Sequence, residues 1–562
     1  MRVSATAVAP VKVRGQATPI APSIRFARFA CVLLAIAGIG SGAYMRGWYL
    51  FHRPINSNEA IAGLMARHIL HGHFFAFYWG HAYGGVEPYL TAAGFGIFGT
   101  SAWVLRAVPV LLSIGAALLA WRATRRLVND SMLAVLAGAV VWAVPASALY
   151  NSSMESGFRG VTLFCGLAVL LFALRILDGN DHWWNYGALG LFVGIGWWSS
   201  PEVVYYLIPA GLMLLGYFWS KRDQWVALLS RVGVLVVLAG VGMLPWLWAN
   251  ANSGFKSLKT SSLGGSPPFT YRGRLDHFFH YSLGMLFSLR DAFDGRWLGG
   301  RTVGEVLIAL VLVVLGVSLG LAVIRGGRAL AIAVSVVAFP FVMAISPVSW
   351  YWQTGRYDGY VVPLYVMLVA IGGFAIERVA SSRKRTAPPR DSIGSSAGRL
   401  TFSAVGAFLI AMSLLSFVKD PFPGVSVTAG WGDPNKPSSL AIRTLEKSGV
   451  RYGYANYWVA YRLDLLSKEH LQVTVGQGEF DRWTPYTRQV SAHREAAWIF
   501  VKSTPSAIEQ WFNTAGPGGT TEAGFINQLK ADSIGYRVVN AGTLDAVIPT
   551  SPISAGNFWP TP

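Results

Sequence analysis

Long apolar stretches separated by short polar ones run through most of the chain. A helix needs about 20 apolar residues to cross a membrane, and eleven stretches approach that length. They are residues 27–47, 103–121, 131–149, 158–177, 183–199, 202–219, 227–248, 302–324, 329–346, 360–377 and 400–418. The pattern predicts a polytopic α-helical membrane protein with about eleven transmembrane helices in a domain of residues 27–418.

The stretch INSNEAIAGLMARHIL (residues 55–70) breaks this pattern, because its apolar positions recur at helical spacing along one face only. Asn58 is a suitable N-cap for this helix, and Glu59 favours its N-terminus. A second helix follows in VEPYLTAAGFGIFG, beginning at Glu87. Because both lie in the long loop 48–102, we expect two amphipathic helices along the outer membrane surface. The aromatic residues of HFFAFYW would lie at headgroup level, and an interfacial belt without chemistry is the alternative.

The last part of the chain, residues 419–562, alternates strand-like and helical segments. VRYGYA, LQVTVG, AAWIFV, YRVV and LDAVIP read as strands, and LAIRTLEKSGV and YWVAYRLDLLS read as helices, with two further helices before YRVV. This alternation predicts a small α/β domain outside the membrane. Residues 1–26 are rich in Ala, Val, Pro and basic residues, and we expect a disordered cytoplasmic N-terminus.

Composition and charge placement support a membrane protein. The chain has 562 residues, of which 53% are hydrophobic and 13% charged, against about 25% charged in soluble domains. The net charge of +19 gathers in short loops such as WRATRRL, SKRDQ and SSRKRTAPPR. With the N-terminus inside, these loops are cytoplasmic, as the positive-inside rule requires. The charge thus indicates topology and contact with anionic lipid in a plasma membrane, and not nucleic-acid binding.

The outer side then holds residues 48–102, 150–157, 249–301, 347–359 and everything after Phe417. A cleaved signal peptide at the first span is the alternative to a membrane anchor, although the apolar run is long for one. The two cysteines, Cys31 and Cys165, lie in apolar segments and form no metal or redox motif. No Walker loop, HExxH motif or row of charges within the spans is present in the sequence. These absences argue against nucleotide chemistry, zinc hydrolysis and an ion path.

Carboxylates gather on the predicted outer side. Glu59 and Glu87 begin the two loop helices, Glu155 lies in YNSSMESGFRG, and Glu202 opens a span in WWSSPEVVYY. Each could be a solvated or helix-stabilising acid when considered singly. Acids at one membrane level from separate loops favour a functional site.

One arginine also lies on the predicted outer side, in SWYWQTGRYDGYVVP. Arg356 and Tyr357 stand just before a span. A guanidinium suits bidentate phosphate binding, and the alternative is a snorkelling arginine packed on Trp350 or Trp352.

The segments NEAIAGLMARHILHGHFFAFYWGHAYGGVEPYLTA, WVLRAVP, WWSSPEVVYYLIP and TGRY together resemble bacterial membrane glycosyltransferases of the GT-C class. The likeness runs from about residue 30 to 365 and is greatest to the branch similar to the protein mannosyltransferases of family 39. The resemblance implies inverting transfer of a sugar from a polyprenyl-phosphate donor. It implies no cofactor, with a weak dependence on divalent cations left open, and no dedicated metal site.

The resemblance also implies roles for particular residues. The family's first outer loop opens on an Asp-Glu pair whose Asp is regarded as the base, and this chain has Asn58-Glu59 instead. Glu155 matches a second acid, and Arg356 is the best match for the arginine that holds the lipid phosphate. An amide cannot take a proton, so three alternatives stand: Glu59 is the base, Glu155 is the base with Asn58 orienting the acceptor, or catalysis is lost. His81, Tyr83, Glu87, Glu202 and Tyr357 are expected to line the substrate pocket, although His81 could be an interfacial histidine without a role.

The sequence therefore favours a glycosyltransferase that moves a hexose or pentose to an envelope glycan, lipid or protein. The alternatives are a silent relative that binds lipid-linked sugar or scaffolds an envelope assembly, and a lipid or glycan transporter. A transporter would need functional polar residues at mid-membrane depth, and Arg159, near the outer end of its span, is the main exception among otherwise apolar spans.

Overall fold

The computed structural model describes residues 22–258, 270–346, 349, 351, 353–382, 394–422, 425–493, 495–502, 516–551 and 553. The expected disordered N-terminus lies mostly outside these residues. So do most of the basic run SSRKRTAPPR and the two tryptophans, Trp350 and Trp352, proposed to pack on Arg356.

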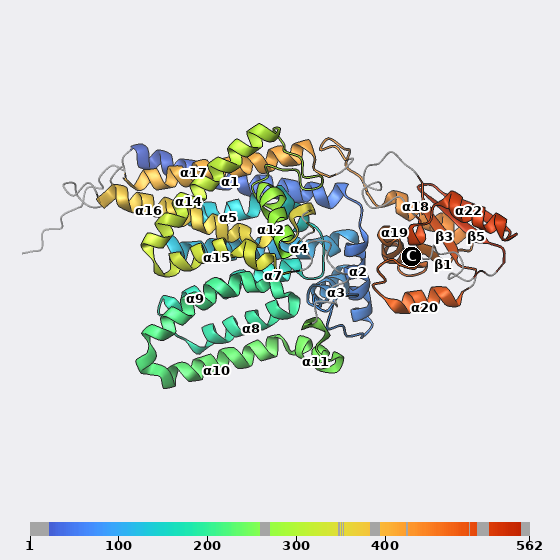
Figure 1. Cartoon of the computed structure of the whole chain (residues 1–562), viewed down its shortest axis with the longest axis horizontal. Helices are drawn as coiled ribbons and strands as arrows, with labels where there is room; N and C mark the ends of the chain where they lie inside the picture. The colour runs from blue at the N-terminus through green and yellow to red at the C-terminus, as the bar shows by residue number, and fades with distance from the viewer. Residues whose placement is uncertain are drawn as a thin grey trace, which may run out of the picture.

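Helices make up the part of the chain before residue 420 (Figure 1). The long ones are α1 (Pro22–His52), α4 (Ala102–Val128), α5 (Ser131–Ala143), α7 (Arg159–Leu177), α8 (Trp183–Ser199), α9 (Val204–Ser220), α10 (Trp225–Gly242), α14 (Arg301–Arg325), α15 (Gly327–Met343), α16 (Val362–Ser382) and α17 (Gly394–Lys419). Shorter ones are α2 (Ser57–Leu70), α3 (Glu87–Phe98), α6 (Ala146–Asn151), α11 (Leu244–Ser253), α12 (Tyr271–His277) and α13 (Leu283–Leu286). The single turns are η1 (Pro201–Val203), η2 (Arg222–Gln224), η3 (Lys256–Leu258), η5 (Phe278–Ser282), η6 (Gln353–Gly355) and η7 (Gly359–Val361).

All eleven predicted apolar stretches contain a helix, but fewer are long enough to cross a bilayer alone. Among the described residues, seven helices meet the length and hydropathy expected of a span, and the pair α10 and α11, bent by 62°, would make an eighth. Helix α5 has 13 residues, and α8 and α15 have 17 each. At about 1.5 Å per residue these three fall short of a 30 Å hydrocarbon core. The polytopic helical fold is thus confirmed, with seven or eight of the described helices, α9 counted together with the turn η1, long and apolar enough to cross a membrane alone.

The C-terminal part forms the predicted α/β domain. Its sheet has the order β2-β1-β3-β5-β4, with β1 (Tyr452–Ala455), β2 (Gln472–Val475), β3 (Ala497–Val501), β4 (Tyr536–Ala541) and β5 (Leu544–Pro549). Strand β1 is parallel to β2 and β3, whereas β5 is antiparallel to β3 and β4. Its helices and turn are α18 (Lys436–Lys447), α19 (Tyr457–Leu466), α20 (Thr484–Ala492), η8 (Pro517–Gly519) and α22 (Glu522–Ala531).

Protein and not lipid covers the apolar face of helix α2, which differs from the sequence-based expectation. The α/β domain lies at the end of the helical bundle next to α2 (Figure 1), and the apolar face of α2 shares a core with α19. Gly63 shows how close they are, because a Cβ there would lie 2.9 Å from a methyl carbon of Leu465. A helix with one apolar face can bury it against lipid or protein, and here the C-terminal domain provides the partner.

The aromatic residues after α2 are divided between solvent and this same interface. Phe74 is exposed, but Tyr78 and Trp79 are buried. Trp79 stacks on Trp483 of the C-terminal domain, with ring centroids 4.4 Å apart and planes 6° from parallel. Tyr78 and Trp79 are therefore covered by protein and not by lipid headgroups. Their burial fixes the first long loop beneath the C-terminal domain.

Candidate functional site

Helix α2 begins with a capping box that differs from the predicted cap. The N-cap is Asn56, whose side chain accepts a hydrogen bond from the backbone N–H of Glu59 at 3.0 Å. Oε2 of Glu59 accepts in return from the backbone N–H of Asn56 at 3.2 Å. An acid completes a capping box only three residues after the cap. Asn58, which directly precedes Glu59, is therefore inside the first turn and is not the cap.

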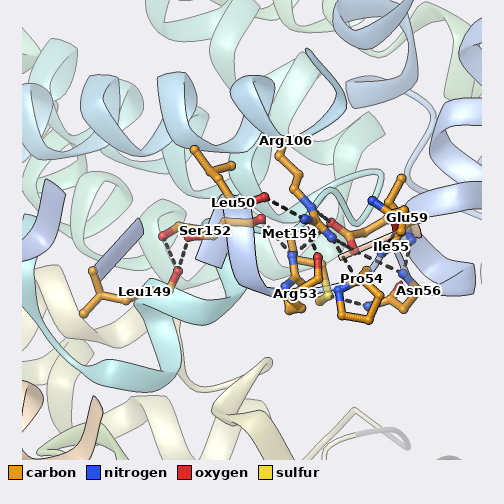
Figure 2. A network of polar contacts seen from close by, with 12 residues as sticks. Leu50, Arg53, Pro54, Ile55, Asn56, Glu59, Arg106, Leu149, Ser152 and Met154 are labelled. Carbon is orange, nitrogen blue, oxygen red and sulfur yellow. Dashed lines mark hydrogen bonds and ion pairs between the residues drawn. The ribbon is translucent and has the colours of Figure 1, made fainter. Parts of the chain in front are cut away.

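Glu59 is held between two arginines (Figure 2). Arg106 donates from Nε to Oε1 at 2.8 Å and from Nη2 to Oε2 at 3.0 Å, and Arg53 donates from Nη2 to Oε1 at 2.9 Å. All three side chains are buried, with at most 1% exposed. Arg106 also donates to the backbone carbonyls of Leu50, Arg53 and Pro54. This cluster joins α4, α2 and the end of α1 into one rigid unit.

The surroundings of Glu59 are unsuited to a general base. Burial alone would raise its pKa, but the charges of Arg106 and Arg53 outweigh burial and lower the pKa below 4.5. A base needs a free lone pair and a pKa near the working pH. Both oxygens of Glu59 already accept hydrogen bonds, so its catalytic role stays a prediction that the geometry opposes.

Glu87 and Glu155 form a buried acid pair. Oε1 of Glu87 accepts from the backbone N–H of Val161, in the first turn of α7, and Oε1 of Glu155 accepts from the backbone N–H of Gly157, each at 2.8 Å. Burial, the negative charge of Glu87 and a hydrogen bond to it raise the pKa of Glu155 well above 4.5. Burial also raises the pKa of Glu87, opposed by the hydrogen bond from Glu155. Two buried carboxyl groups this close do not readily carry two negative charges, which favours the protonated form of Glu155.

Three of the predicted pocket residues, from separate loops, line one cavity. It has a volume of about 300 Å³ and contains Tyr83, Glu202 and Tyr357. The remaining lining residues are Ala82, Trp197, Ser200, Pro201, Val204, Tyr205, Trp246, Ser257, Leu258, Val342, Ile345 and Ser346. Oε2 of Glu202 accepts from the Ser200 hydroxyl at 3.1 Å. Glu202 is thus the predicted acid that faces an open space.

Arg159 stands beside this cavity. Its guanidinium carbon lies 4.9 Å from the ring centroid of Phe158 and 5.7 Å from that of Tyr357. Its charge acts on both Glu202 and Tyr83. Nε of Arg159 is buried with no hydrogen-bond partner among the described residues. A buried donor without a partner costs free energy, so this guanidinium is available to bind an anion that enters the cavity.

Arg356, the predicted phosphate ligand, does not line the cavity. Its Nε donates to the Thr354 hydroxyl at 3.1 Å, and its guanidinium carbon lies 4.4 Å from the ring centroid of Tyr351. Arg356 is half-buried and directly follows the turn η6. Of the two arginines, Arg159 therefore has the better position for a phosphate in the cavity.

His81 and Asn58 both contact the C-terminal domain. Arg482 donates to Nε2 of His81, and the Tyr457 hydroxyl donates to Oδ1 of Asn58 at 2.7 Å. Burial and the nearby charges of Arg482 and Arg159 lower the pKa of His81 well below 6.5. The imidazole is therefore neutral and accepts a hydrogen bond at Nε2, and its part in the substrate pocket stays a prediction.

Sequence reasoning missed several charged and polar contacts of this region. They involve Arg53, Arg106, Tyr457 and Arg482, while Arg159 was noted only as an exception to apolar spans. One available signal was the set of arginines at the predicted outer ends of spans, which oppose the positive-inside bias. No local pattern connects residues 58 and 457.

Carboxylates that could hold a metal ion occur elsewhere in the described part of the chain. Oxygens of Asp291, Asp294 and Asp420 lie within 4.8 Å of one another. Asp294 also pairs with Arg296, and none of the three lines the cavity. Metal dependence remains a prediction.

Part of the sequence matches a known protein family. Residues 85–248 match the family "Dolichyl-phosphate-mannose-protein mannosyltransferase", a range that includes Glu87, Glu155, Arg159 and Glu202. No curated protein sequence matches the chain.

Two crystal structures share the fold. ArnT from Cupriavidus metallidurans in the apo state matches with a TM-score of 0.56 and 13% identity, over 96% of this chain and 100% of that one. ArnT bound to undecaprenyl phosphate matches with a TM-score of 0.54 and 13% identity, over 94% and 99%. At this identity the likeness establishes the fold. Together with the family match, it confirms the similarity of this chain to GT-C membrane glycosyltransferases of the protein-mannosyltransferase branch.

Proposed function

We propose that the protein transfers a sugar from a polyprenyl-phosphate donor to a cell-envelope glycan, lipid or protein on the outer face of the plasma membrane. The single observation that carries this proposal is the cavity at which Tyr83, Glu202 and Tyr357 meet beside the half-buried Arg159. Support also comes from ArnT, which shares the fold and whose crystal structure contains undecaprenyl phosphate.

In this proposal the donor phosphate binds next to Arg159, which neutralises its negative charge. The acceptor hydroxyl attacks the anomeric carbon, and the bond between that carbon and the phosphate oxygen breaks. The polyprenyl phosphate leaves with the bonding electrons. Attack from the opposite face gives inversion, and the hydroxyl proton passes to a carboxylate that faces the cavity.

Glu202 is the acid that we assign to this proton. Among the four predicted acids it alone lines the cavity, whereas Glu59 is neutralised by Arg53 and Arg106. Glu155 and Glu87 hold one another and the start of α7, so we assign them a supporting role. Asn58 then contributes hydrogen bonds and no proton transfer.

We infer the orientation of the protein in the membrane from the placement of its basic loops. With the N-terminus in the cytoplasm, the cavity and the α/β domain are both outside, where nucleotide sugars are absent. A donor anchored in the membrane suits such a site.

A second candidate function is a silent relative that binds lipid-linked sugar without transferring it. The observation that favours it is the loss of a free acid in the first loop, where Asn58 is an amide and Glu59 is bound by two arginines.

Purified protein in liposomes, offered a panel of labelled polyprenyl-phosphate sugars and an envelope extract, separates the two functions. Movement of label to the extract supports the enzyme. Binding of a donor without transfer supports the silent relative.

A further inference from the structure

The C-terminal domain reaches into the first loop through a chain of hydrogen bonds. Tyr457, the first residue of α19, places its hydroxyl oxygen 2.7 Å from Oδ1 of Asn58. Nε of Arg482 lies 3.1 Å from the same hydroxyl oxygen. Asn58 is partly exposed, and Tyr457 and Arg482 are 399 and 424 residues later in the sequence.

Donor and acceptor in each of these hydrogen bonds follow from the chemistry of the side chains. A guanidinium can only donate, so the Tyr457 oxygen accepts from Arg482. The single hydroxyl proton of Tyr457 is then directed to Asn58, which must present its carbonyl oxygen. The Nδ2 group of Asn58 consequently points away from Tyr457, and no protein partner for it is found among the described residues.

Further hydrogen bonds hold the backbone of both Asn58 and Tyr457. The Tyr78 hydroxyl donates to the backbone carbonyl of Asn58 at 2.6 Å, and the Ser57 hydroxyl donates to the backbone carbonyl of Tyr457. Oε2 of Glu479 accepts from the backbone N–H of Tyr457 at 2.6 Å. Such a network orients a side chain more strictly than a single contact.

The loop backbone is also shaped to receive Arg482. Gly80 has a φ of +72°, and a Cβ there would lie 2.8 Å from Cδ of Arg482. Only glycine combines this conformation with this close approach. The side chain of Arg482, from the C-terminal domain, therefore packs closely against the backbone of the first loop.

We propose that Tyr457 and Arg482 of the C-terminal domain are positioning residues, which orient the Asn58 amide so that its Nδ2 group donates a hydrogen bond to a substrate oxygen. This inference rests on the proposed transfer reaction and deepens it. It gives the α/β domain a direct part in the site, and it gives the amide at position 58 a role that a carboxylate cannot fill, since a carboxylate has no proton to donate.

The test compares transfer by the full-length protein in liposomes with that by three variants. Tyr457→Phe removes the hydroxyl that orients Asn58. Asn58→Asp keeps an acceptor for Tyr457 but removes the Nδ2 donor, and Asn58→Ala removes both. We expect each to lower kcat/KM by about tenfold, as loss of one hydrogen bond to substrate does. Tyr457→Phe combined with Asn58→Ala should cost no more than Asn58→Ala, because both act on the same hydrogen bond.

The matched control is Tyr486→Phe. Tyr486 is at the same domain boundary, but its hydroxyl donates to Glu469 at 2.6 Å and not to Asn58. We expect wild-type transfer from it. Equal losses in Tyr457→Phe and Tyr486→Phe would overturn the inference, because domain docking alone would explain both.

Full activity of Asn58→Asp would overturn it too, since the Nδ2 group would then be dispensable. An inactive wild type would instead refute the proposed function. An active wild type with unchanged Tyr457→Phe would refute only this inference.

Discussion

Arg106 holds Glu59 through two parallel hydrogen bonds, from Nε to Oε1 and from Nη2 to Oε2, so that the guanidinium covers one edge of the carboxylate (Figure 2). Arg53 covers Oε1 from another direction. The acid that opens the first loop is therefore part of a buried ion cluster. This relationship separates the structural role of Glu59 from the chemistry at the cavity.

Glu59→Gln should destabilise the protein strongly. It leaves Arg53 and Arg106 buried without a counter-charge, which costs about 3–5 kcal/mol. Thermal unfolding in detergent measures the loss. The control is Glu305→Gln, which removes an exposed pair with Arg301 and should change little. A Glu59→Gln protein that melts like wild type but transfers no sugar would contradict this account and return Glu59 to the role of base.

Glu155→Gln should be tolerated. Because burial and Glu87 raise the pKa of Glu155, its protonated form is favoured, and glutamine resembles that form in shape and in its ability to donate. We expect stability and transfer close to wild type from Glu155→Gln and a clear loss of stability from Glu155→Ala, which leaves a cavity. If Glu155→Gln folds normally but loses transfer, the second acid has a catalytic role after all.

Arg159→Gln should weaken donor binding. The guanidinium beside Tyr357, whose charge acts on Glu202, is the group that we assign to the donor phosphate. A charged hydrogen bond is worth about 1.5–3 kcal/mol, so KM for the donor should rise by about 10- to 100-fold. Arg356→Gln is the comparison, and we expect a KM near wild type from it. A raised donor KM in Arg356→Gln together with a wild-type KM in Arg159→Gln would instead identify Arg356 as the phosphate ligand.

Docking of the C-terminal domain on α2 should depend on pH through Glu469. Its carboxylate accepts hydrogen bonds from His68 at 2.8 Å, Tyr486 at 2.6 Å and Arg67 at 3.1 Å. Burial raises its pKa, but the hydrogen bonds from His68 and Tyr486 and the charge of His68 lower it to about 2 from 4.5. The stabilisation from a lowered pKa is complete above pH 4.5 and is lost as the pH falls through 2.

Unfolding of the full chain measured from pH 5 to pH 2 tests this dependence. Stability should fall more steeply with acid in the wild type than in Glu469→Gln. Identical slopes for the two proteins would show that Glu469 contributes nothing to docking.

Local patterns in the sequence predicted much of the fold. The eleven apolar stretches and all five strands of the C-terminal domain are observed as helices and strands. The sequence patterns did not predict which part of the protein each element packs against. Helix α2 has the apolar face of a surface helix, but whether lipid or protein covers that face depends on residues such as Leu465, some 400 positions later.

The candidate site could be predicted only in part, for the same reason. Tyr83, Glu202 and Tyr357 were placed on one membrane side from topology and share a cavity. The same reasoning could not tell that Glu59 would be paired, because its partner Arg106 is 47 residues away in a different helix. Burial and ion pairing decide whether an acid is a base or a structural element, and both come from tertiary contacts.

Glu202, the acid that lines the cavity, is the residue to which we assign proton transfer. Sugar transfer in liposomes, from the labelled polyprenyl-phosphate sugar that wild type accepts, should be compared between Glu202→Gln and wild type of matched folded amount. We expect a normally folded Glu202→Gln protein with kcat lower by about 10²- to 10⁴-fold, as for loss of a general base. Transfer by Glu202→Gln at the wild-type rate would show that Glu202 is not the base.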